Sequence, residues 1–337
     1  MKYGVIFGGA SFEHEISIVS AITIKEKLDI SAFIFVDEER DFYLIDKENM
    51  KSSYFAKREY KKAKKLILKK GGFFTQGLFK KRVEFDVAIN LIHGKDGEDG
   101  KLPALLEWHE ILAITPNVEA CVISFNKLFT KMYAKEIGVS VIEYEVINKP
   151  QTRFDFPVIV KPARLGSSIG VSIAKNKEEL KYAFDVAREF DDLIIVEPFI
   201  EGIEEYNLAG CYANEWIFSK LEKVDKKEYL DFEKKYMDFS RKEVKLVEDE
   251  KLKPKFEETF KIIYNKTFKN TLIRCDFFYK DGIIYLNEIN PIPGSLANYL
   301  FDDFRSVVDR LAKSLVTEEK IKIEYQYINK INQAKGK

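Results

Sequence analysis

The sequence predicts a mixed α/β and α+β protein with two or three domains, and three observations lead to this prediction. The chain has 337 residues, which is more than the roughly 150 residues of one typical domain. In about the first hundred residues, apolar runs alternate with a helical pattern, as in a parallel α/β unit. Further along the chain, short strands separated by loops favour antiparallel sheets.

Composition and charge narrow the class of protein. Hydrophobic residues make up 46% and charged residues 33% of the chain, as in an ordinary globular protein. The 55 lysines and arginines balance 55 aspartates and glutamates, so no overall field favours nucleic acid or an anionic membrane. The 3 cysteines lie far apart, as expected of buried thiols in a reducing compartment. We therefore expect a cytoplasmic protein that binds neither nucleic acid nor a membrane.

The N-terminal region begins as strand, glycine turn and helix. An apolar run ends in Gly8-Gly9-Ala10-Ser11, and helical spacing follows it. The lysine-rich segment 57–70 is interpreted as the solvated face of a helix rather than as a nucleic-acid patch, because the chain is neutral overall. The elements expected here are strands at residues 3–7, 32–36 and 85–92 and a helix at residues 15–28.

Polar loops divide the rest of the chain. A glycine-rich break at residues 94–100 marks the first domain boundary. Residues 223–245 form a long segment without periodicity, which is typical of a functional lid or of disorder. The charged tail at residues 318–337 is expected to pack weakly. Helices are expected at 102–112, 126–137, 177–190 and 256–268, and strands at 157–162, 171–174, 193–197, 207–211, 216–220, 272–279 and 283–289.

The last two expected strands are separated by Lys280-Asp281-Gly282, which is a strong hairpin signal. Because side chains alternate between the faces of a strand, Arg274 shares a face with Asp276, and Glu288 shares a face with Asn290. We expect Asp276 to lie within about one residue of register with Glu288. Two carboxylates and an amide oxygen suit Mg²⁺. On spacing alone, a salt-bridged solvent face of the sheet is an equally good interpretation.

A second candidate site follows the strand at residues 157–162. Lys161 lies at the end of this strand, and the small-residue loop 166–170 offers backbone N–H groups and hydroxyls to an anion. This is not a Walker A loop, and the nearest candidate, residues 94–101, has one residue too many before its final Gly-Lys. No GxGxxG follows the first strand. A simple flexible turn is the alternative interpretation of the loop.

Five motifs follow one another along the chain: Gly8-Gly9-Ala10-Ser11 with His14-Glu15-Ile16-Ser17; His93-Gly94 with Gly97-Glu98-Asp99-Gly100; Val160-Lys161-Pro162 with Gly166-Ser167-Ser168-Ile169-Gly170; Arg274-Cys275-Asp276; and Asn287-Glu288-Ile289-Asn290-Pro291 with Pro293-Gly294. In this order and spacing they resemble the D-alanine:D-alanine ligases, a family of ATP-grasp enzymes. The resemblance covers residues 4 to about 312. It favours the magnesium site over the solvent face for the hairpin.

The resemblance implies an ATP-grasp fold in which the nucleotide lies between the central and C-terminal domains. It also implies that the chain forms a homodimer. The implied divisions are an N-terminal α/β substrate domain at residues 1–102, a central ATP-grasp domain at 103–202, a C-terminal ATP-grasp catalytic domain at 203–317 with a mobile lid at 223–245, and the charged tail at 318–337.

For the reaction, the resemblance implies that Glu15 holds the ammonium group of the first D-alanine and that Arg274 lies at the reacting carboxyl group. Glu15, Ser167 and Tyr236 resemble a triad that ties the lid to the substrate site. These four residues are the implied catalytic set. The implied substrate-binding residues are Glu15, His93, Lys235, Gly294, Ser295, Tyr299 and Leu300.

The segment after Pro293-Gly294 departs from the family at one position. Many relatives have a serine near Tyr299, where it binds the carboxylate of the second D-alanine. A hydrogen bond from the Tyr299 hydroxyl, from Ser295 or from a backbone N–H would replace it, and plain packing of Tyr299 is an equal alternative. The backbone N–H of Gly294 is expected beside Arg274, where both stabilise the oxyanion.

For the nucleotide, Lys127 and Lys161 resemble the lysines on the ATP phosphates, and residues 197–200 resemble the hinge strand that borders adenine. Glu205 resembles the carboxylate on the ribose, with Glu204 as the alternative. The implied nucleotide-binding residues are Lys127, Lys161, Ser167, Ser168, Glu197, Pro198, Phe199, Ile200 and Glu205. The implied metal ligands are Asp276, Glu288 and Asn290, for two Mg²⁺ ions or for Mn²⁺ in their place.

The resemblance therefore implies an ATP-dependent ligase that joins two D-alanine molecules through a D-alanyl phosphate, for peptidoglycan synthesis. An ATP-grasp ligase for another second substrate, such as D-lactate, is the alternative within enzymes. A nucleotide-responsive binding protein without turnover is the alternative from another class. The complete set Lys161, Arg274, Asp276, Glu288 and Asn290 argues against that last alternative.

Overall fold

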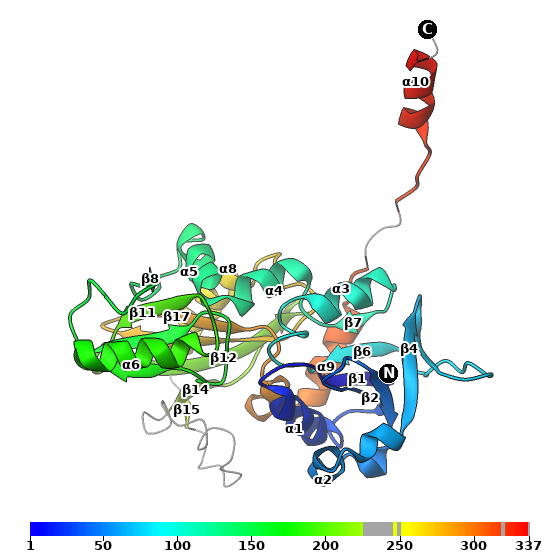
Figure 1. Ribbon diagram of the computed structural model, residues 1–337, viewed down its shortest axis with the longest axis horizontal. Coiled ribbons are helices and arrows are strands. Elements are labelled where there is room, and N and C mark those ends of the chain that lie inside the picture. Colours follow the sequence, from blue (N-terminus) through cyan, green and yellow to red (C-terminus); the bar gives the residue numbers. More distant parts are fainter. Residues whose placement is uncertain (225–244, 248–250, 318–320, 336–337) are drawn as a thin grey trace.

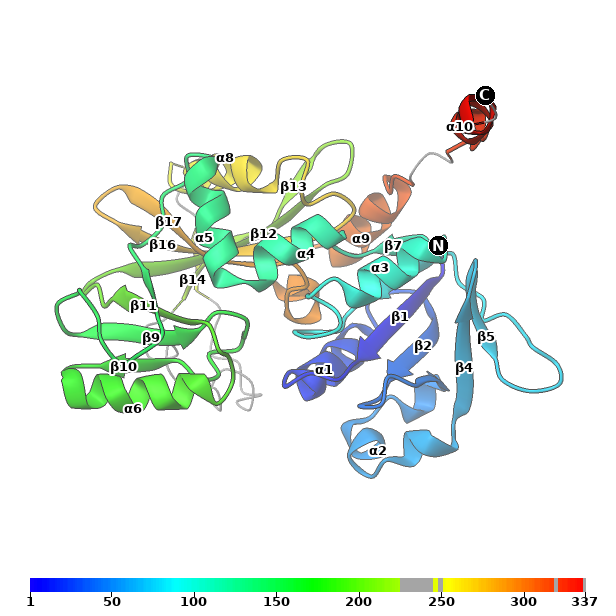
Figure 2. The same cartoon turned by 45° about the horizontal axis from the view of Figure 1, so that its top comes forward.

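The computed structural model describes residues 1–224, 245–247, 251–317 and 321–335. These residues form three sheets with helices packed against them. The first sheet lies at one end of the molecule and the other two lie at the opposite end (Figures 1 and 2). Among the described helices, none is both long and apolar enough to cross a membrane.

The first sheet has seven strands and mixes parallel with antiparallel pairs. The parallel part is the one predicted, and its central strand is completely buried. Helix α1 (His14–Ile24) packs beside that strand. In order across the sheet the strands are β5 (Gly72–Thr75), β4 (Lys64–Lys69), β3 (Phe42–Ile45), β2 (Ile30–Val36), β1 (Tyr3–Gly8), β6 (Val87–Asn90) and β7 (Ala113–Ile114). The short helices of this region are η1 (Lys47–Asn49), α2 (Ser52–Ala56), η2 (Glu59–Lys62) and α3 (Lys101–Trp108).

The prediction of a helix at residues 57–70 is wrong. Strand β4 occupies the second half of this segment and pairs with a strand on each side. The apolar run Leu66-Ile67-Leu68 explains the difference, because it is long enough for a strand and Leu66 is buried. Lys64 and Lys69 lie at the two ends of the strand, where they are exposed.

The second sheet is antiparallel, as predicted, with the strand order β10-β9-β11-β8. Helix α6 (Lys177–Arg188) covers it, and its buried residues Leu180, Ala183, Phe184 and Ala187 follow the helical period. The Asn176 side chain caps this helix by accepting a hydrogen bond from the backbone N–H of Glu179. The strands are β8 (Glu145–Ile147), β9 (Val158–Pro162), β10 (Ser172–Ala174) and β11 (Ile194–Pro198).

The third sheet contains the predicted hairpin. Its core is rich in aromatic residues, which include Tyr206, Phe256 and Phe260. Its strands are β12 (Glu204–Tyr212), β13 (Trp216–Phe218), β14 (Leu221–Val224), β15 (Leu246–Val247), β16 (Ile273–Lys280) and β17 (Ile283–Asn290). The helices that contribute to this core are α4 (Val118–Phe125), which was not predicted, α5 (Lys127–Glu136) and α8 (Lys253–Tyr264).

The chain returns to the first sheet near its C-terminal end. The 3-10 segment η4 (Gly294–Leu300) contacts α1, and helix α9 (Phe304–Lys313) shares the core of the first sheet. The Tyr3 hydroxyl donates a hydrogen bond to Asp309 Oδ1 at 2.6 Å across this contact. The predicted domain ranges stay a prediction. Helix α10 (Gln326–Lys335) has no buried residue and stands clear of the body (Figure 1), which agrees with the weak packing expected of the tail.

Candidate functional site

The hairpin of β16 and β17 has the predicted register. Asp276 lies opposite Glu288, and Arg274 lies opposite Asn290. A β-bulge between Asp276 and Phe277 shifts the pairing by one residue, so Leu286 lies opposite Phe277 and is buried. The four polar side chains therefore lie next to one another at the end of the hairpin away from its turn.

Cations hold both carboxylates of the hairpin. The Arg274 guanidinium donates to Asp276 through Nε at 2.6 Å and through its terminal nitrogen at 2.8 Å. Burial lowers the pKa of Arg274, but the Asp276 carboxylate outweighs this effect and raises it overall. The Lys127 ammonium lies 3.1 Å from Glu288 Oε2. Only 2% of the Asp276 side chain is exposed, so this pair is not part of a solvated sheet face.

The donor set of the hairpin fits a hard divalent cation. Asp276, Glu288 and Asn290 offer two carboxylates and one amide oxygen on neighbouring strands. Asn290 Nδ2 is buried and has no hydrogen-bond partner within the described part of the chain. In that same part, no three His, Cys, Asp or Glu side chains gather as a metal cluster. A cation here would therefore depend on the amide and on further oxygen ligands from outside the chain.

The loop after β9 reaches both the hairpin side and the N-terminal region. Ser167 and Ser168 have left-handed backbone angles, with φ of 58° and 59°. The Ser167 hydroxyl donates a hydrogen bond to Glu13. A Cβ atom at Gly166 would lie 2.9 Å from Glu13 Oε1, so any larger residue here would displace the Glu13 carboxylate. Lys127 Nζ donates to the Leu165 carbonyl at 2.8 Å, which joins the loop to α5.

The structure brings Glu13, and not the predicted Glu15, beside Ser167. Glu15 is exposed in the first turn of α1, whereas only 6% of Glu13 is exposed. Glu13 is the N-cap residue of α1 and precedes the first helical turn, so its side chain leaves the helix on another side. Glu15 lies where an acidic residue favours the helix dipole.

The surroundings of Glu13 make its negative charge costly. Burial raises the pKa of Glu13, and the nearby Glu98 carboxylate raises it further, while the hydrogen bond from Ser167 works in the opposite direction. The predicted pocket residue His93 is 4% exposed, with Nδ1 3.7 Å from Glu98 Oε1. A site with two close carboxylates suits a ligand that brings a positive charge.

The segment η4 lies against this pocket. The His93 ring Nε2 is 2.8 Å from Ser20 Oγ, which accepts a hydrogen bond at 3.0 Å from the backbone N–H of Ser295. Gly294 has open space where a Cβ would stand, with no atom within 4 Å. Leu300 is completely buried and belongs to the core rather than to a free surface.

Tyr299 points toward the hairpin side of the site. Its hydroxyl donates a hydrogen bond to Glu222 Oε2 at 2.8 Å. Glu222 also accepts from Asn207 Nδ2 at 2.9 Å. Burial raises the pKa of Tyr299, although the nearby Arg274 opposes the shift. The hydroxyl therefore stays protonated and can donate.

The predicted nucleotide residues of the hinge lie at the end of β11 and the start of β12. Glu197 is buried, and its carboxylate accepts a hydrogen bond from Lys161 at 2.8 Å. Pro198, Phe199 and Ile200 follow it, and 38% of Phe199 is exposed. Glu204 accepts hydrogen bonds from Lys223 and from the Tyr206 hydroxyl. Glu205 lies opposite Phe278 and Val224 in the sheet, so the choice between Glu204 and Glu205 stays open.

Two of the predicted residues, Lys235 and Tyr236, lie outside the described residues, as does most of the proposed lid at residues 223–245. The prediction also missed three residues that the structure brings to the site: Glu13, Lys131 and Glu222. Lys131 follows Lys127 by one helical turn, which was the available signal.

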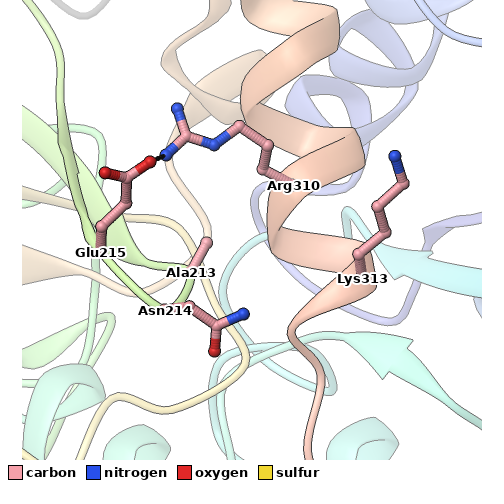
Figure 3. Close-up of a pocket in the computed structure, with 5 residues that line it drawn as sticks. All are labelled: Ala213, Asn214, Glu215, Arg310 and Lys313. Atoms are coloured by element: carbon pink, nitrogen blue, oxygen red, sulfur yellow. Dashed lines mark hydrogen bonds and ion pairs between the residues drawn. The ribbon is translucent and has the colours of Figure 1, made fainter.

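One pocket joins the separate parts of the site. It lies between α4, α5, the loop after β9 and the end of β17. Its lining residues are Glu98, Ser124, Phe125, Lys127, Leu165, Gly166, Glu288, Ile289 and Asn290. A second pocket lies between the turn that joins β12 to β13 and helix α9, where Arg310 pairs with Glu215 (Figure 3). None of its lining residues was predicted for the site, so it serves as a reference surface.

Comparison with known proteins identifies the class and then the family. Residues 2–114 match the family model described as "D-ala D-ala ligase N-terminus". Residues 129–305 match the model described as "D-ala D-ala ligase C-terminus". The fold is that of an ATP-grasp ligase. Because the two matches cover most of the chain, it belongs to the D-alanine–D-alanine ligase family.

Curated relatives are similar to this chain over their full length. A D-alanine–D-alanine ligase of Nitratiruptor is 55% identical over 341 residues, which cover 99% of this chain and 100% of the relative. A D-alanine–D-alanine ligase of Wolinella succinogenes is 56% identical over 345 residues, with all of both chains covered. The chain is therefore similar to these ligases from end to end.

Solved structures extend the similarity to the fold. The crystal structure of the D-alanine–D-alanine ligase from Helicobacter pylori is 45% identical, with a TM-score of 0.85, and covers 95% of this chain and 100% of its own. The ligase from Bacillus anthracis, crystallised with ATP, has a TM-score of 0.62 at 21% identity and covers 93% of this chain and 96% of its own. At that identity, the second match supports the fold alone.

Proposed function

We propose that the chain joins two D-alanine molecules to D-alanyl-D-alanine while ATP is converted to ADP and phosphate. Membership of the family supports this reaction. The observation that carries it is a pocket in which Lys127, the loop around Gly166 and the hairpin carboxylate Glu288 meet. The buried Glu13 beside this loop completes the arrangement.

The reaction needs two steps because a carboxylate is a poor electrophile. In the first step, a carboxylate oxygen of one D-alanine attacks the γ-phosphate of ATP, and ADP leaves. In the second step, the amine of the other D-alanine attacks the resulting acyl phosphate, loses a proton and displaces phosphate. Both steps build negative charge, so catalysis depends mainly on positioning and electrostatic stabilisation.

The residues of the site suit these demands. We assign Glu13, in place of Glu15, to the ammonium group of the first D-alanine, because Glu13 is a buried carboxylate whose charge is disfavoured by burial and by the nearby Glu98. Lys127 and Lys161 are assigned to the phosphates. Arg274 and the backbone N–H of Gly294 are assigned to the oxyanion of the second step.

The magnesium and lid assignments complete the proposal. When bound, Mg²⁺ supplies positive charge at the phosphoryl oxygens, and Asp276, Glu288 and Asn290 are the residues that would hold two such ions or Mn²⁺. The acyl phosphate must be shielded from water, which gives the proposed lid at residues 223–245 its role. Lys235 and Tyr236 keep their proposed lid roles.

We also propose the cellular setting and organisation. The need for ATP and the separate cysteines support a cytoplasmic enzyme. Its product would be a precursor of peptidoglycan in the bacterial cell wall. The ranges 1–102, 103–202 and 203–317 are proposed as its domains, and the chain is proposed to form a homodimer.

A phosphate-release assay tests the reaction. ATP, Mg²⁺ and D-alanine should release phosphate and yield the dipeptide, which mass spectrometry identifies. L-alanine should give only background release, and chelation of Mg²⁺ should abolish the reaction. Addition of D-lactate should leave the dipeptide as the main product. Equal phosphate release with D-alanine and L-alanine would contradict the proposal, and a dominant ester product would change the second substrate.

A further inference from the structure

Lys131 is a fully buried lysine to which the proposed reaction gives no role. It lies on α5 with 0% of its surface exposed. Its ammonium nitrogen is 2.7 Å from Glu197 Oε1, but the two groups are not aligned as a hydrogen bond. No other described residue offers this nitrogen a hydrogen bond. Because a buried ammonium group is costly, it is held by the charge attraction to Glu197 and by the face of the Tyr144 ring, whose centre lies 5.4 Å away.

Glu197 lies between two lysines. Lys161 donates to Oε2 at 2.8 Å, on the opposite oxygen from Lys131. Burial alone would raise the pKa of Glu197, but the charges of Lys161 and Lys131 outweigh burial and lower it. Glu197 is therefore ionised, and a single negative charge faces two ammonium groups.

The state of Lys131 follows from the same contacts. Burial lowers the pKa of Lys131 to about 8, although the Glu197 carboxylate opposes this shift. At neutral pH most of the Lys131 population is then still protonated. The cluster of Lys131, Glu197 and Lys161 therefore has a net charge of about +1.

The two lysines on α5 contact different carboxylates. Lys127 and Lys131 lie one turn apart on the helix. Lys127 contacts the hairpin carboxylate Glu288, whereas Lys131 contacts Glu197 on the hinge strand. Of the two lysines that contact Glu197, Lys161 belongs to the strand that leads into the Ser167 loop, and 6% of it is exposed. Lys161, which the proposed function assigns to the phosphates, is thus the more exposed of the two lysines.

We propose that Lys131 is a positioning residue for the nucleotide: it neutralises Glu197 and so leaves the charge of Lys161 available to the phosphates of ATP. This inference rests on the proposed function. Without Lys131, the Glu197 carboxylate would form a neutral pair with Lys161, and the attraction of Lys161 for phosphate would fall. If Lys131 only supported the hinge strand, its loss would affect adenine and phosphate binding alike.

Calorimetry can separate a role at the phosphates from a role at the hinge strand. Binding of the non-hydrolysable analogue AMP-PNP with Mg²⁺ reports on both parts of the nucleotide, whereas binding of adenosine reports on the part without phosphates. In Lys131→Met, the Kd of AMP-PNP should rise about tenfold or more, while the Kd of adenosine changes less than about twofold. The double variant Lys131→Met/Glu197→Gln leaves Lys161 as a lone cation. Its ratio of the two Kd values should return to that of the wild type.

Lys135→Met is the matched control, because Lys135 is exposed one turn further along α5 and lies 4.4 Å from the centre of the Tyr144 ring. It should leave both Kd values unchanged. If Lys131→Met does not fold, Lys131→Gln takes its place. An unchanged ratio of Kd values in the single variant, or no recovery in the double variant, would overturn the inference. Wild-type protein that fails to bind AMP-PNP would instead contradict the proposed function.

Discussion

The two ends of the candidate site hold their carboxylates in opposite ways. At the hairpin end, Asp276 is bound by Arg274 and Glu288 lies against Lys127, so each acidic side chain has a cation in contact. At the N-terminal end, Glu13 accepts a hydrogen bond from the neutral Ser167 hydroxyl. The first end is locally balanced in charge, and the second is short of positive charge.

This difference suggests which ligand each end receives. The Glu98 carboxylate beside Glu13 adds to the negative charge of a buried region. An amino acid that brings its ammonium group there would supply the missing cation. At the hairpin, phosphates and metal ions would replace the contacts that Arg274 and Lys127 already make with the two carboxylates. In the proposed reaction, binding of the nucleotide would exchange one set of partners for another, whereas binding of the first D-alanine would supply a positive charge that the site lacks.

Substitution of Arg274 tests the hairpin end and has the largest expected effect. Lysine cannot form the two parallel hydrogen bonds that Arg274 makes with Asp276. In Arg274→Lys, kcat for phosphate release with D-alanine should fall by about 10²–10³, because the oxyanion loses its positioned donor. Arg310→Lys changes the Arg310–Glu215 pair of the reference pocket (Figure 3) and should leave kcat unchanged. Wild-type kcat in Arg274→Lys would remove Arg274 from the reaction.

The hairpin end was the more predictable from sequence, because its geometry is local. A glycine-containing turn sets the pairing of two adjacent strands, and the two-residue period then fixes which side chains share a face. This reasoning correctly placed Asp276 within one residue of register with Glu288, and the two lie directly opposite each other. The bulge after Asp276 was not predictable, since one extra residue leaves no clear pattern in the sequence.

The N-terminal end was not predictable in the same way. The contact between Ser167 and Glu13 joins residues 154 positions apart. Whether Glu13 or Glu15 faces the loop depends on where α1 begins, and a sequence pattern locates helix ends only to within about two residues. Lys131 was missed for another reason: lysine is almost never fully buried, so its type predicts solvent exposure.

Substitution of Glu13 tests the N-terminal end, with a smaller expected effect. In Glu13→Gln, KM for the first D-alanine should rise about 10–100-fold, because an amide replaces the charged partner of the ammonium group. The KM for ATP should change little. Glu15→Gln is the matched control two residues away, and its exposed side chain should leave both KM values unchanged. If Glu15→Gln raised KM for D-alanine and Glu13→Gln did not, Glu15 would be the residue that binds the ammonium group.

Tyr299 is the residue at the hairpin end for which a contact with the second D-alanine is proposed. Tyr299→Phe keeps the ring but removes the hydroxyl that donates to Glu222. If the hydroxyl helps to bind the second carboxylate, KM for the second D-alanine should rise about 3–10-fold, which is the effect of one hydrogen bond. Tyr212→Phe, on an exposed ring beside Trp216, is the control. An unchanged second KM would assign Tyr299 to packing.

The smallest expected effect concerns stability and follows from the raised pKa of Glu13. Burial and the Glu98 carboxylate raise this pKa above the ordinary value for glutamate. Between the ordinary and the raised value, the folded chain binds more protons than the unfolded chain, so stability falls as the pH rises through this window. Above the window, the folded chain retains the full cost of the buried charge.

Glu13→Gln removes that cost, so the variant should be the more stable protein at pH 8 although it is the poorer enzyme. Its melting temperature should exceed that of the wild type by about 1–3 °C at pH 8, and the difference should shrink as the pH falls through the window. Glu15→Gln should show no such pH-dependent difference, because Glu15 is exposed. Thermal melts of all three proteins between pH 4 and pH 8 measure this. A lower melting temperature for Glu13→Gln at pH 8 would mean that Glu13 already has a compensating cation in the free protein, and the contrast between the two ends of the site would disappear.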